Sequence, residues 1–303
     1  MSATSPQNAG ALLLEGTERL RVAGSESARL DAELLLGDAI GVGRTVIVAH
    51  IGATVGPEAA ARYRAWIDRR AAGEPVAYIR GIKEFYGLAF SVDKRALIPR
   101  PETERLVELA EAEVRRRLAG SAAGSGVRIV DVGTGSGAIA VALAVGLVRR
   151  HALEAVALLA TDVSDDALDL ARENAVAHAV AEAIAFAQSD LLADASVAAS
   201  KPFDLVLANL PYVRHDVVPV LPIAASFEPA TALDGGEDGL EIIERLLQQL
   251  PERLAEDGLA LIEIGADQGD LIVERCRHVL PGWQCDVEPD LAGLPRVARI
   301  QRS

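Results

Sequence analysis

The sequence predicts an α/β protein in which a small helical bundle precedes a doubly wound, mainly parallel sheet. Three observations lead to this prediction: apolar residues recur at helical spacing over residues 11–72, apolar runs of strand length alternate with helical segments from residue 127 onward, and glycines follow the first of those runs. Parallel strands are continuously apolar because helices cover both faces of their sheet. Ligands bind beyond the carboxyl ends of such strands, so residues at those ends are the first candidates for a functional site.

The N-terminal domain is predicted to be helical and to span residues 1–80. Leucines and alanines at helical spacing are interrupted by Gly37, Gly41 and Gly43. A second amphipathic helix is expected after Pro57, a favourable residue for the first turn of a helix. We interpret the four arginines of that helix as a solvated face. They are Arg62, Arg64, Arg69 and Arg70.

Residues 81–103 are expected to form a linker that contains a strand pair. Aromatic and β-branched residues on both sides of a central glycine favour strands, and Pro99 and Pro101 stiffen the exit from the segment. Phe85 and Phe90 either line a cofactor pocket or pack the linker, and the sequence supports both alternatives equally.

The third predicted domain spans residues 104–303 and contains the sheet. Its first helix is expected to begin at Glu102 or Thr103 and to end near Leu118, with a loop over residues 119–126 after it. Seven strands are expected at 127–132, 155–161, 184–188, 203–208, 259–264, 284–287 and 297–302. Further helices are expected at 138–150, 164–179, 240–254 and 268–280. This alternation of strands and helices indicates a parallel sheet.

The charge balance and the composition restrict the class of protein. Thirty basic residues against 44 acidic ones give a net charge of −14, whereas proteins that bind a nucleic-acid backbone usually carry the opposite balance. A DNA or RNA substrate is therefore not expected. Cys276 and Cys285 are expected to be free thiols in a reducing compartment. With no basic, apolar leader and no apolar run long enough to span a membrane, we expect a soluble, cytoplasmic protein without a membrane partner.

A glycine-rich turn joins the first strand to the next helix and is the first candidate binding element. It consists of Gly133, Thr134, Gly135, Ser136 and Gly137. Glycines at such a turn allow positive φ and let the backbone touch a ligand. The turn is therefore expected to bind a cofactor, although dinucleotide-binding folds contain a similar one.

Two further strands end in carboxylates. Asp162 ends the second strand, where a carboxylate can accept hydrogen bonds from both hydroxyls of a ribose. Asp190 ends the third strand, placed to receive an adenine amino group while Leu191 covers a face of the ring. Each acid alone is equally well explained as a turn former. Together the three strand ends fit an adenosine cofactor, and they do not by themselves separate S-adenosylmethionine from NAD.

The fourth strand ends in Asn209, Leu210, Pro211 and Tyr212. These residues form either an ordinary polar turn or a site that activates a planar nitrogen, whose delocalised lone pair makes it a poor nucleophile. In the second case the Asn209 side-chain carbonyl and the Leu210 backbone carbonyl hold the two N–H groups, so that the nitrogen directs its lone pair at an electrophile. Pro211 stiffens the loop, and Tyr212 offers a flat wall to the acceptor.

The sequence resembles the HemK/PrmC family of peptide-chain release factor glutamine methyltransferases over nearly its whole length. The resemblance rests on short runs at residues 73–81, 84–85, 97–104, 131–137, 209–212, 227–229, 232–233 and 263–265. The run Ile-Pro-Arg-Pro-Glu-Thr at residues 98–103 is specific to this family among methyltransferases.

The resemblance implies a class I, Rossmann-like methyltransferase that uses S-adenosylmethionine. Its expected product carries a methyl group on the side-chain amide nitrogen (N5) of the glutamine in the Gly-Gly-Gln motif of class I release factors. The resemblance further implies that Gly133–Gly137, Asp162, Asp190–Leu191 and Asn209 contact the cofactor. It implies that residues 209–212 hold the substrate glutamine and that the N-terminal helices help to dock the release factor.

One residue departs from the family pattern and keeps other functions open. Leu210 stands where the family usually has the first of two prolines, and Asn-Leu-Pro-Tyr is also similar to the motif of ribosomal RNA adenine dimethyltransferases. An N6-adenine methyltransferase acting on DNA or rRNA is therefore one alternative. An inactive methyltransferase-fold binding protein is another, against which the intact glycine turn argues. None of the five histidines pairs with another at ligand spacing, so no metal is expected.

Overall fold

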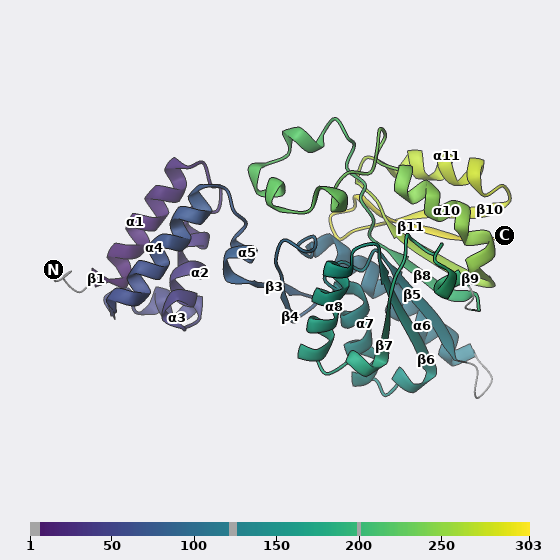
Figure 1. Cartoon of the computed structure of the whole chain (residues 1–303), viewed down its shortest axis with the longest axis horizontal. Coiled ribbons are helices and arrows are strands. Elements are labelled where there is room, and N and C mark those ends of the chain that lie inside the picture. Colours follow the sequence, from purple (N-terminus) through teal and green to yellow (C-terminus); the bar gives the residue numbers. More distant parts are fainter. Residues whose placement is uncertain (1–6, 121–125, 199–200) are drawn as a thin grey trace. The chain divides into compact units, whose positions relative to one another are not determined.

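The structure is a computed structural model that describes residues 7–120, 126–198 and 201–303. It divides the chain into two compact units (Figure 1). Unit 1 consists of Met1–Ile82 with Pro222–Phe227, and unit 2 consists of Lys83–Leu221 with Glu228–Ser303. Most of the loop expected at 119–126 lies outside the described residues, and its first two positions continue a helix.

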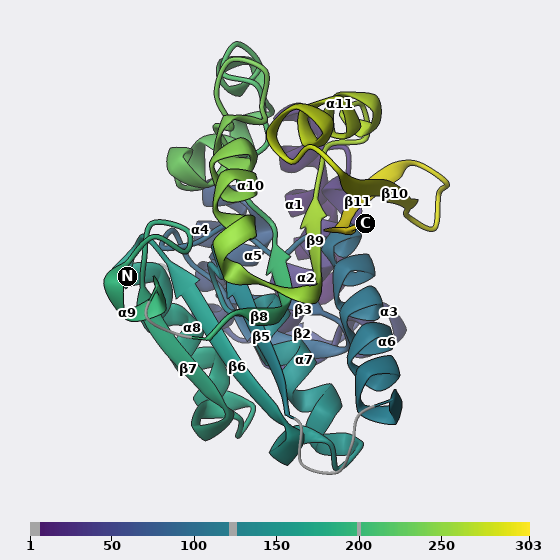
Figure 2. The same cartoon turned by 90° about the vertical axis from the view of Figure 1, so that its right-hand side faces the viewer.

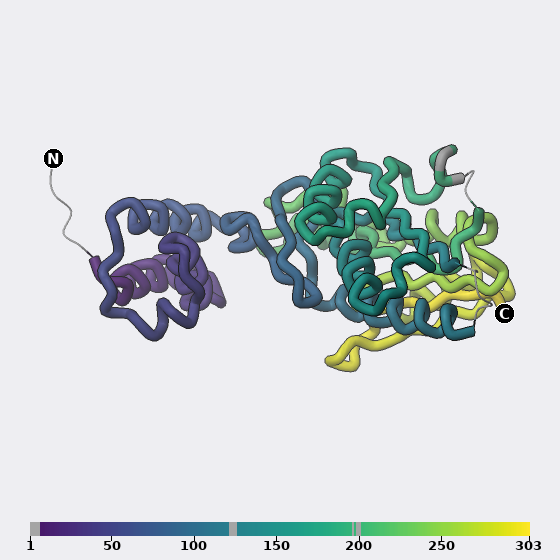
Figure 3. The backbone as a smooth tube through the Cα atoms, turned by 90° about the horizontal axis from the view of Figure 1, so that it is seen from below, coloured from purple at the N-terminus to yellow at the C-terminus, as the bar shows by residue number. Residues whose placement is uncertain are grey.

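Unit 1 is a bundle of helices, as the apolar spacing predicts. Its helices are α1 (Ala9–Val22), α2 (Ala28–Ile40), α3 (Arg44–Ala49), α4 (Pro57–Ala71) and α5 (Val76–Arg80), and β1 (Gln7–Asn8) pairs with β2 (Thr54–Val55). Figure 3 follows the turns of these helices in purple and blue. Asn8 caps α1 by accepting a hydrogen bond from the Ala11 amide at 2.7 Å. Pro57 occupies the first turn of α4.

Two of the four α4 arginines, Arg64 and Arg70, join α4 to other helices, which corrects their interpretation as part of a solvated face; Arg62 and Arg69 are exposed, as that interpretation expects. Arg70 donates to the buried carboxylate of Asp31 at 2.7 Å. Arg64 donates to Glu15 on α1 at 2.7 Å. The sequence could not show this because the partners lie 39 and 49 residues away.

A short segment far along the chain also belongs to unit 1. Residues 222–227 contain a 3₁₀ turn, Ile223–Phe227. The Ile223 side chain covers Gly73, where an added Cβ would lie 2.6 Å from Ile223 Cγ2. Glycine is therefore required at position 73, which also adopts a φ of +101°.

Unit 2 contains the predicted seven-stranded sheet, in the order β10-β11-β9-β8-β5-β6-β7. The strands are β5 (Val127–Val132), β6 (Val156–Asp162), β7 (Ile184–Gln188), β8 (Phe203–Ala208), β9 (Leu254–Glu263), β10 (Trp283–Pro289) and β11 (Pro295–Arg302). The first five are mutually parallel, and β11 is antiparallel to β9 and β10. The β10–β11 pair closes the chain as the yellow hairpin in Figure 3. The mainly parallel α/β fold is thus confirmed.

Helices cover both faces of the sheet. One face carries α6 (Glu104–Gly120), α7 (Ala138–Arg149) and α8 (Asp165–Ala177), and the other carries α10 (Glu241–Arg253) and α11 (Gly269–Val279). Figure 2 shows α10 and α11 on the opposite side of the strands from α6 and α7. Val130 and Val132 of β5 point into the core under α10 and α11. Asp131, between them, therefore points to the α7 face.

The start of β9 differs from its prediction. The strand begins at Leu254, five residues before the expected position, and its pairing with β8 is irregular between Phe203 and Leu205. The sequence did not predict this early segment because the polar run Glu256–Gly258 interrupts the apolar pattern of the strand. A short helix, α9 (Ala195–Ala198), was not predicted.

The linker forms the expected strand pair, β3 (Ile82–Phe85) with β4 (Leu88–Ser91). Tyr86 and Gly87 both have positive φ, as a tight two-residue hairpin turn requires. Phe85 and Phe90 are fully buried and contact each other edge to face, with ring centroids 6.0 Å apart. Both rings therefore pack the linker, which answers the question that the sequence left open.

Asn174 on α8 joins the linker to the glycine-rich turn. Its Oδ1 accepts from the Ser91 amide at 2.8 Å, and its Nδ2 donates to the carbonyls of Ser91 and Ser136 at 3.1 and 2.9 Å. The side chain is completely buried. A single amide thus satisfies three backbone groups and fixes the position of the turn relative to β4.

The packing of α1 against α4 generates a stability prediction. A Cβ added at Gly16 would lie 1.9 Å from the Tyr63 hydroxyl oxygen, whose hydrogen is donated to the Leu12 carbonyl. We expect Gly16→Ala to lower the free energy of unfolding by about 1–3 kcal/mol, as overpacking does, although alanine is the better helix former. Chemical denaturation measures the change.

Gly52→Ala is the matched control, because nothing lies within 4 Å of an added Cβ there. Its effect should stay within about 0.5 kcal/mol. Adding Tyr63→Phe to Gly16→Ala should recover part of the lost stability, since the closest clash is with the hydroxyl. Equal stability of Gly16→Ala and the unchanged chain would contradict this account.

Candidate active site

The register of the parallel strands places the candidate residues in one row. Val132 pairs with Thr161 on one side and with Ala208 on the other, and Ala208 pairs with Ile262. The residues that follow these positions are Gly133, Asp162, Asn209 and Glu263. Because the strands are parallel, all four emerge at the same edge of the sheet.

The glycine-rich turn needs its glycines for conformation and for space. Gly133, Gly135 and Gly137 all have positive φ. A Cβ at Gly133 would lie 2.8 Å from Leu210 Cδ2, and one at Gly137 would lie 3.0 Å from the Ala171 Cβ. The backbone of the turn therefore lies close to the Asn209–Tyr212 loop on one side and to α8 on the other.

Asp162 holds the middle of this turn. Its Oδ2 accepts from the Gly135 amide at 2.9 Å, and its Oδ1 accepts from the Ser164 amide at 3.0 Å. Burial raises the pKa of Asp162, and these two amide donors oppose the rise. Each carboxylate oxygen keeps a further lone pair, so the side chain can still accept hydrogen bonds from a ligand.

Asp131 is a buried acid to which the sequence analysis gave no role. It is fully buried, and Oδ2 accepts from the Thr134 hydroxyl at 2.6 Å and from the Ala140 amide at 3.2 Å. Within residues 7–120, 126–198 and 201–303, Oδ1 has no hydrogen-bond partner. Burial raises the pKa of Asp131 to about 7. The signal in the sequence was an acid that interrupts the apolar run from Ile129 to Val132.

Asp190 and Leu191 lie beside the end of β6. The Ser189 amide donates to the Asp162 carbonyl at 2.9 Å, which brings the two strand ends together. Asp190 is exposed and pairs with Arg245 of α10 at 2.5 Å. Leu191 has a positive φ of 56°. Its side chain is buried and packs in the hydrophobic core of the sheet.

The Asn209–Tyr212 loop is fixed by side chains from three other segments. Asn209 Nδ2 donates to Thr103 Oγ1 at 2.9 Å, and the Tyr212 hydroxyl donates to Glu263 Oε1 at 3.2 Å. Gln268 Nε2 donates to the Tyr212 carbonyl at 3.0 Å. These contacts fix the amide, the ring and the backbone of the loop.

Two glycines press against the same loop. A Cβ at Gly235 would lie 2.7 Å from the Pro211 carbonyl oxygen, and one at Gly239 would lie 2.4 Å from the Tyr212 carbonyl oxygen. Backbone bonds continue this contact, since Val213 and Gly235 each donate to the segment opposite. The backbone of residues 235–239 therefore packs directly on the loop.

Two acceptors of the loop are left open. Among the described residues, no protein group donates to Asn209 Oδ1 or to the Leu210 carbonyl. The Leu210 side chain, in contrast, is 4% exposed and packs in the core against the glycine-rich turn. The loop thus combines a rigid backbone with two carbonyl oxygens that are free to accept hydrogen bonds.

Glu263 and Thr103 are further buried residues that the sequence analysis did not assign to the site. Both are at most 3% exposed. Burial raises the pKa of Glu263 to about 7, and the hydroxyls of Thr103 and Tyr212 and the Arg296 guanidinium oppose the rise. The only signal in the sequence was the position of each within a family-like run.

Arg100 has a structural partner at the same edge. Its guanidinium pairs with the buried carboxylate of Glu228 at 2.6 Å, and the second carboxylate oxygen accepts from the Ile98 amide at 3.1 Å. The run at residues 98–103 is therefore tied to Glu228, and this tie positions Thr103 beside Asn209.

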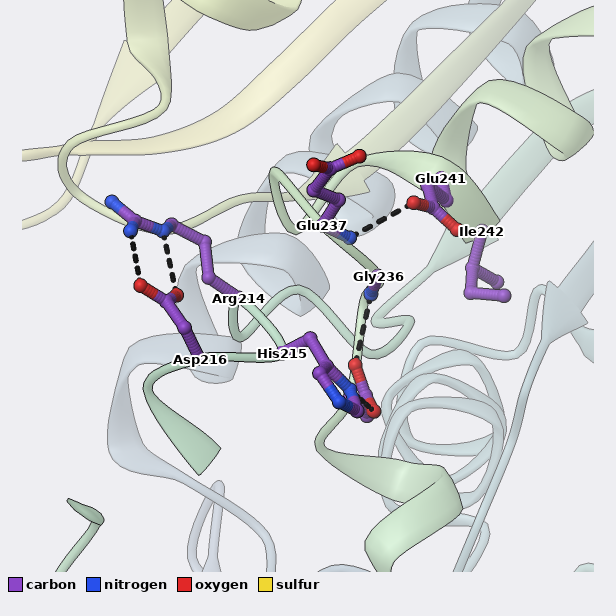
Figure 4. A pocket seen from close by; sticks show the side chains of 8 residues that line it. Arg214, His215, Asp216, Gly236, Glu237, Glu241 and Ile242 are labelled. Carbon is purple, nitrogen blue, oxygen red and sulfur yellow. Dashed lines mark hydrogen bonds and ion pairs between the residues drawn. The ribbon is translucent and has the colours of Figure 1, made fainter. Parts of the chain in front are cut away.

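An open cavity of about 810 Å³ lies just after the loop (Figure 4). Polar side chains line it, namely Arg214, His215, Asp216, Asp234, Glu237 and Glu241. His215 Nδ1 lies 2.7 Å from Asp234 Oδ2, and this carboxylate raises the pKa of His215. No site residue predicted from the sequence lines this cavity.

Over the described parts of the chain, no group of three or more His, Cys, Asp or Glu side chains is arranged to hold a metal ion. No helix in those same parts is both long and apolar enough to cross a membrane.

The buried acids generate a prediction for stability against pH. The pKa of Asp131 is about 7 in the folded chain and 3.8 as a free group. The folded state therefore binds the proton more tightly, and the free energy of unfolding should fall as pH rises from about 4 to about 7, by on the order of 1–4 kcal/mol. Asp131→Asn should remove most of this dependence. Urea unfolding at pH 5 and pH 8, without added cofactor, measures it.

The exposed Asp169→Asn variant is the control and should follow the unchanged chain at both pH values. Parallel pH dependences of the Asp131→Asn variant and the unchanged chain would contradict the burial of an unpaired carboxyl. Ionisation of Glu263, whose pKa is also raised, lowers the free energy of unfolding as pH rises. This contribution is the same in every variant, so it does not affect the comparison.

Two protein-family models match the chain. A family model of the PrmC N-terminal domain matches residues 11–81, and a methyltransferase domain model matches residues 123–287. Among solved structures, the catalytic domain of hMettl16 in complex with the MAT2A 3′UTR hairpin 6 has a TM-score of 0.53 at 17% identity, covering 83% of this chain and 84% of that chain. At this identity the likeness shows the fold alone.

Sequence identity to two whole proteins is higher than the identity to this solved structure. The release factor glutamine methyltransferase of Deinococcus radiodurans is 36% identical over 292 residues, covering 96% of this chain and 98% of that protein. The one of Moorella thermoacetica is 39% identical over 286 residues, covering 93% and 94%. Because relatives of this identity match both units along more than nine-tenths of each chain, the chain belongs to the family of release factor glutamine methyltransferases.

Proposed function

We propose that the chain transfers a methyl group from S-adenosylmethionine to the side-chain amide nitrogen, N5, of the glutamine in the Gly-Gly-Gln motif of class I peptide-chain release factors. The observation that carries the proposal is the pair of open acceptors, Asn209 Oδ1 and the Leu210 carbonyl, on a rigid loop. Family membership supplies the substrate class. We place the reaction in the cytoplasm, where translation factors act.

The residues of the turn fit this cofactor. Asp131 Oδ1 is a buried acceptor that needs a donor such as an ammonium group. The backbone of Gly133–Gly137 leaves room for close approach, and Asp162 keeps lone pairs for ribose hydroxyls. Asp190 would accept from the adenine amino group beside Leu191, while keeping Arg245 as a partner. When bound, S-adenosylmethionine supplies an electrophilic methyl group.

The acceptor residues prepare a planar nitrogen for attack. Asn209 Oδ1 and the Leu210 carbonyl each accept one N–H of the substrate amide, so that the nitrogen can rehybridise, lose conjugation with its carbonyl and direct its lone pair at the methyl group. Pro211 restricts the loop, and the ring of Tyr212 is held by Glu263 to form a wall. No general base is required before the transfer, because the nitrogen becomes acidic once it is alkylated.

Leu210 in place of the usual proline is compatible with this role. The acceptor at this position is a backbone carbonyl, which leucine also has. The leucine side chain adds a buried contact with the glycine-rich turn. This contact supports the rigidity that a proline ring would otherwise supply.

We assign one role to each of the three predicted domains, in the order of the chain. Residues 1–80 would dock the release factor, residues 81–103 would form the linker, and residues 104–303 would bind cofactor and glutamine. The packing of β4 against Asn174 supports a linker that also stabilises the cofactor turn. The net charge of −14 argues against a nucleic-acid substrate.

A labelling experiment tests the proposed function. The chain is incubated with labelled S-adenosylmethionine and, separately, with a release factor, DNA and rRNA. We expect label only in the release factor, with one methyl group on the glutamine of its Gly-Gly-Gln motif by peptide mass spectrometry. Label on adenine with an unmodified glutamine would overturn the proposal in favour of an adenine methyltransferase, and no label at all would favour a binding protein.

The role of Asn209 generates a prediction about rate. Asn209→Ala removes one preorganised acceptor and should lower kcat for the release factor by on the order of 10²–10³. Cofactor affinity should change little, because the turn and Asp162 remain. Steady-state kinetics and calorimetric titration measure the two quantities.

Asn209→Asp is the matched variant, since it keeps the shape and introduces a negative charge. That charge favours the cationic ground state over a transition state in which the positive charge disperses, so kcat should fall while cofactor affinity holds or rises. Wild-type kcat in both variants would remove Asn209 from the mechanism.

A further inference from the structure

The proposed role of Asn209 depends on which way its amide faces. A side-chain amide presents two donors at its nitrogen and an acceptor at its oxygen, and the two ends have nearly the same shape. Only the oxygen can accept the N–H of a substrate amide. The partner of Nδ2, Thr103 Oγ1 at 2.9 Å, therefore decides whether Asn209 presents its oxygen to the acceptor site.

A threonine hydroxyl does not by itself impose this orientation, because it can both donate and accept. Thr103 fixes the amide only if its own hydrogen points elsewhere. Thr103 is 3% exposed, and its hydroxyl lowers the pKa of the Glu263 carboxyl, one oxygen of which, Oε2, is buried without a hydrogen-bond partner among the described residues. An ionised carboxylate has no hydrogen, so it can only accept, and the unpartnered Oε2 is able to accept the hydrogen of Thr103. The Thr103 oxygen is then left to accept from Asn209.

Glu263 is suited to this task by its place in the sheet. Ala208 pairs with Ile262, so Asn209 and Glu263 emerge side by side from neighbouring parallel strands. Glu263 is fully buried, and its Oε1 accepts from Tyr212 at 3.2 Å. Its Oε2 has no hydrogen-bond partner among the described residues, so it remains available to accept the Thr103 hydrogen.

The guanidinium of Arg296 lowers the pKa of Glu263 but does not hydrogen-bond to its carboxylate among the described residues. Arg296 donates to the Ile264 carbonyl and to Asp290, each at 3.3 Å, and forms no ion pair with Glu263 among the described residues. Tyr212 is therefore the donor that hydrogen-bonds to this carboxylate, and the Thr103 hydroxyl is a further neighbour that lowers the pKa of Glu263.

We propose that Thr103 and Glu263 are positioning residues for the acceptor loop: the Glu263 carboxylate orients the Thr103 hydroxyl, and Thr103 in turn holds the Asn209 amide with its oxygen toward the substrate nitrogen. The same carboxylate holds the ring of Tyr212. Neither positioning residue touches the substrate. The inference rests on the proposed function of Asn209 and extends it to two residues outside the loop.

Protonation of Glu263 would reverse the direction of these hydrogen bonds. A protonated carboxyl donates to Thr103, whose hydrogen then turns to Asn209, so the amide turns and presents nitrogen instead of oxygen. Activity should therefore fall as pH decreases through the pKa of Glu263. The groups that act on this carboxyl are Thr103 and Glu102 before α6, Tyr212 after β8 and Arg296 on β11.

Three variants of the full chain test the inference. Thr103→Val has nearly the same shape and no hydroxyl, and we expect kcat for the release factor to fall by about 10- to 100-fold. KM for S-adenosylmethionine should stay within about twofold, because the cofactor residues are unchanged. Thr103→Ser restores the hydroxyl and should recover kcat to within about threefold. Thr17→Val, whose hydroxyl has no partner among the described side chains, is the control and should keep the wild-type kcat.

Two readouts separate positioning from a merely structural role. In the Asn209→Ala background, Thr103→Val should lower kcat by less than twofold further, since the two residues act as one unit. Glu263→Gln should remove the acid limb of the kcat–pH profile, because glutamine does not titrate. A full additional loss in the double variant, or an unchanged acid limb, would overturn the inference.

The orientation of the amide is measured independently of activity. The side-chain Nδ2 resonances of Asn209, assigned by their absence in Asn209→Ala, should shift and exchange faster with solvent in Thr103→Val. If the wild-type chain methylates the release factor but neither kcat nor these resonances respond to Thr103→Val, the inference fails and the proposed function stands. If the wild-type chain leaves the release factor unmodified, the proposed function fails, and the resonances still decide whether Thr103 holds the amide.

Discussion

The parallel register of β5, β6, β8 and β9 is the constraint on which the rest of the site depends. It places Gly133, Asp162, Asn209 and Glu263 in one row at one edge of the sheet, although the first and the last are 130 residues apart in the sequence. Gly133 and Asn209 come directly after a buried strand, and Asp162 and Glu263 are the last residues of theirs, so core packing sets the backbone position of all four. The side chains need only short contacts with their neighbours to complete the site.

Several of those contacts are made by glycines, and their purpose differs from place to place. Gly133 makes room for the Leu210 side chain, and Gly235 and Gly239 let a second backbone segment lie on the Asn209–Tyr212 loop. This close packing replaces part of the stiffness that a second proline would give. The departure at Leu210 is thus accommodated by its surroundings, because the position contributes a backbone carbonyl and a buried side chain at once.

Burial of a carboxylate costs free energy unless hydrogen-bond donors satisfy its oxygens, and the buried acids at this edge differ in how many donors they have. Asp162 accepts two backbone amides, whereas Asp131 and Glu263 each keep one oxygen without a partner in the described residues. Burial raises the pKa of both to about 7. Unsatisfied acids of this kind are concentrated at functional sites, where a ligand or a neighbouring hydroxyl supplies the missing donor.

The sequence by itself determined the fold and the order of the strand ends, because apolar periodicity and glycine positions are local signals. The alternation after residue 127 led to the seven-stranded sheet, and the runs at residues 98–103 and 209–212 led to the family. Only the tertiary structure decided the rest. It assigned Phe85 and Phe90 to packing, gave the α4 arginines their partners, and brought Thr103 and Glu263 to Asn209. These relations join residues 5 to 160 positions apart, and no periodicity or spacing in a single sequence encodes which distant side chains meet.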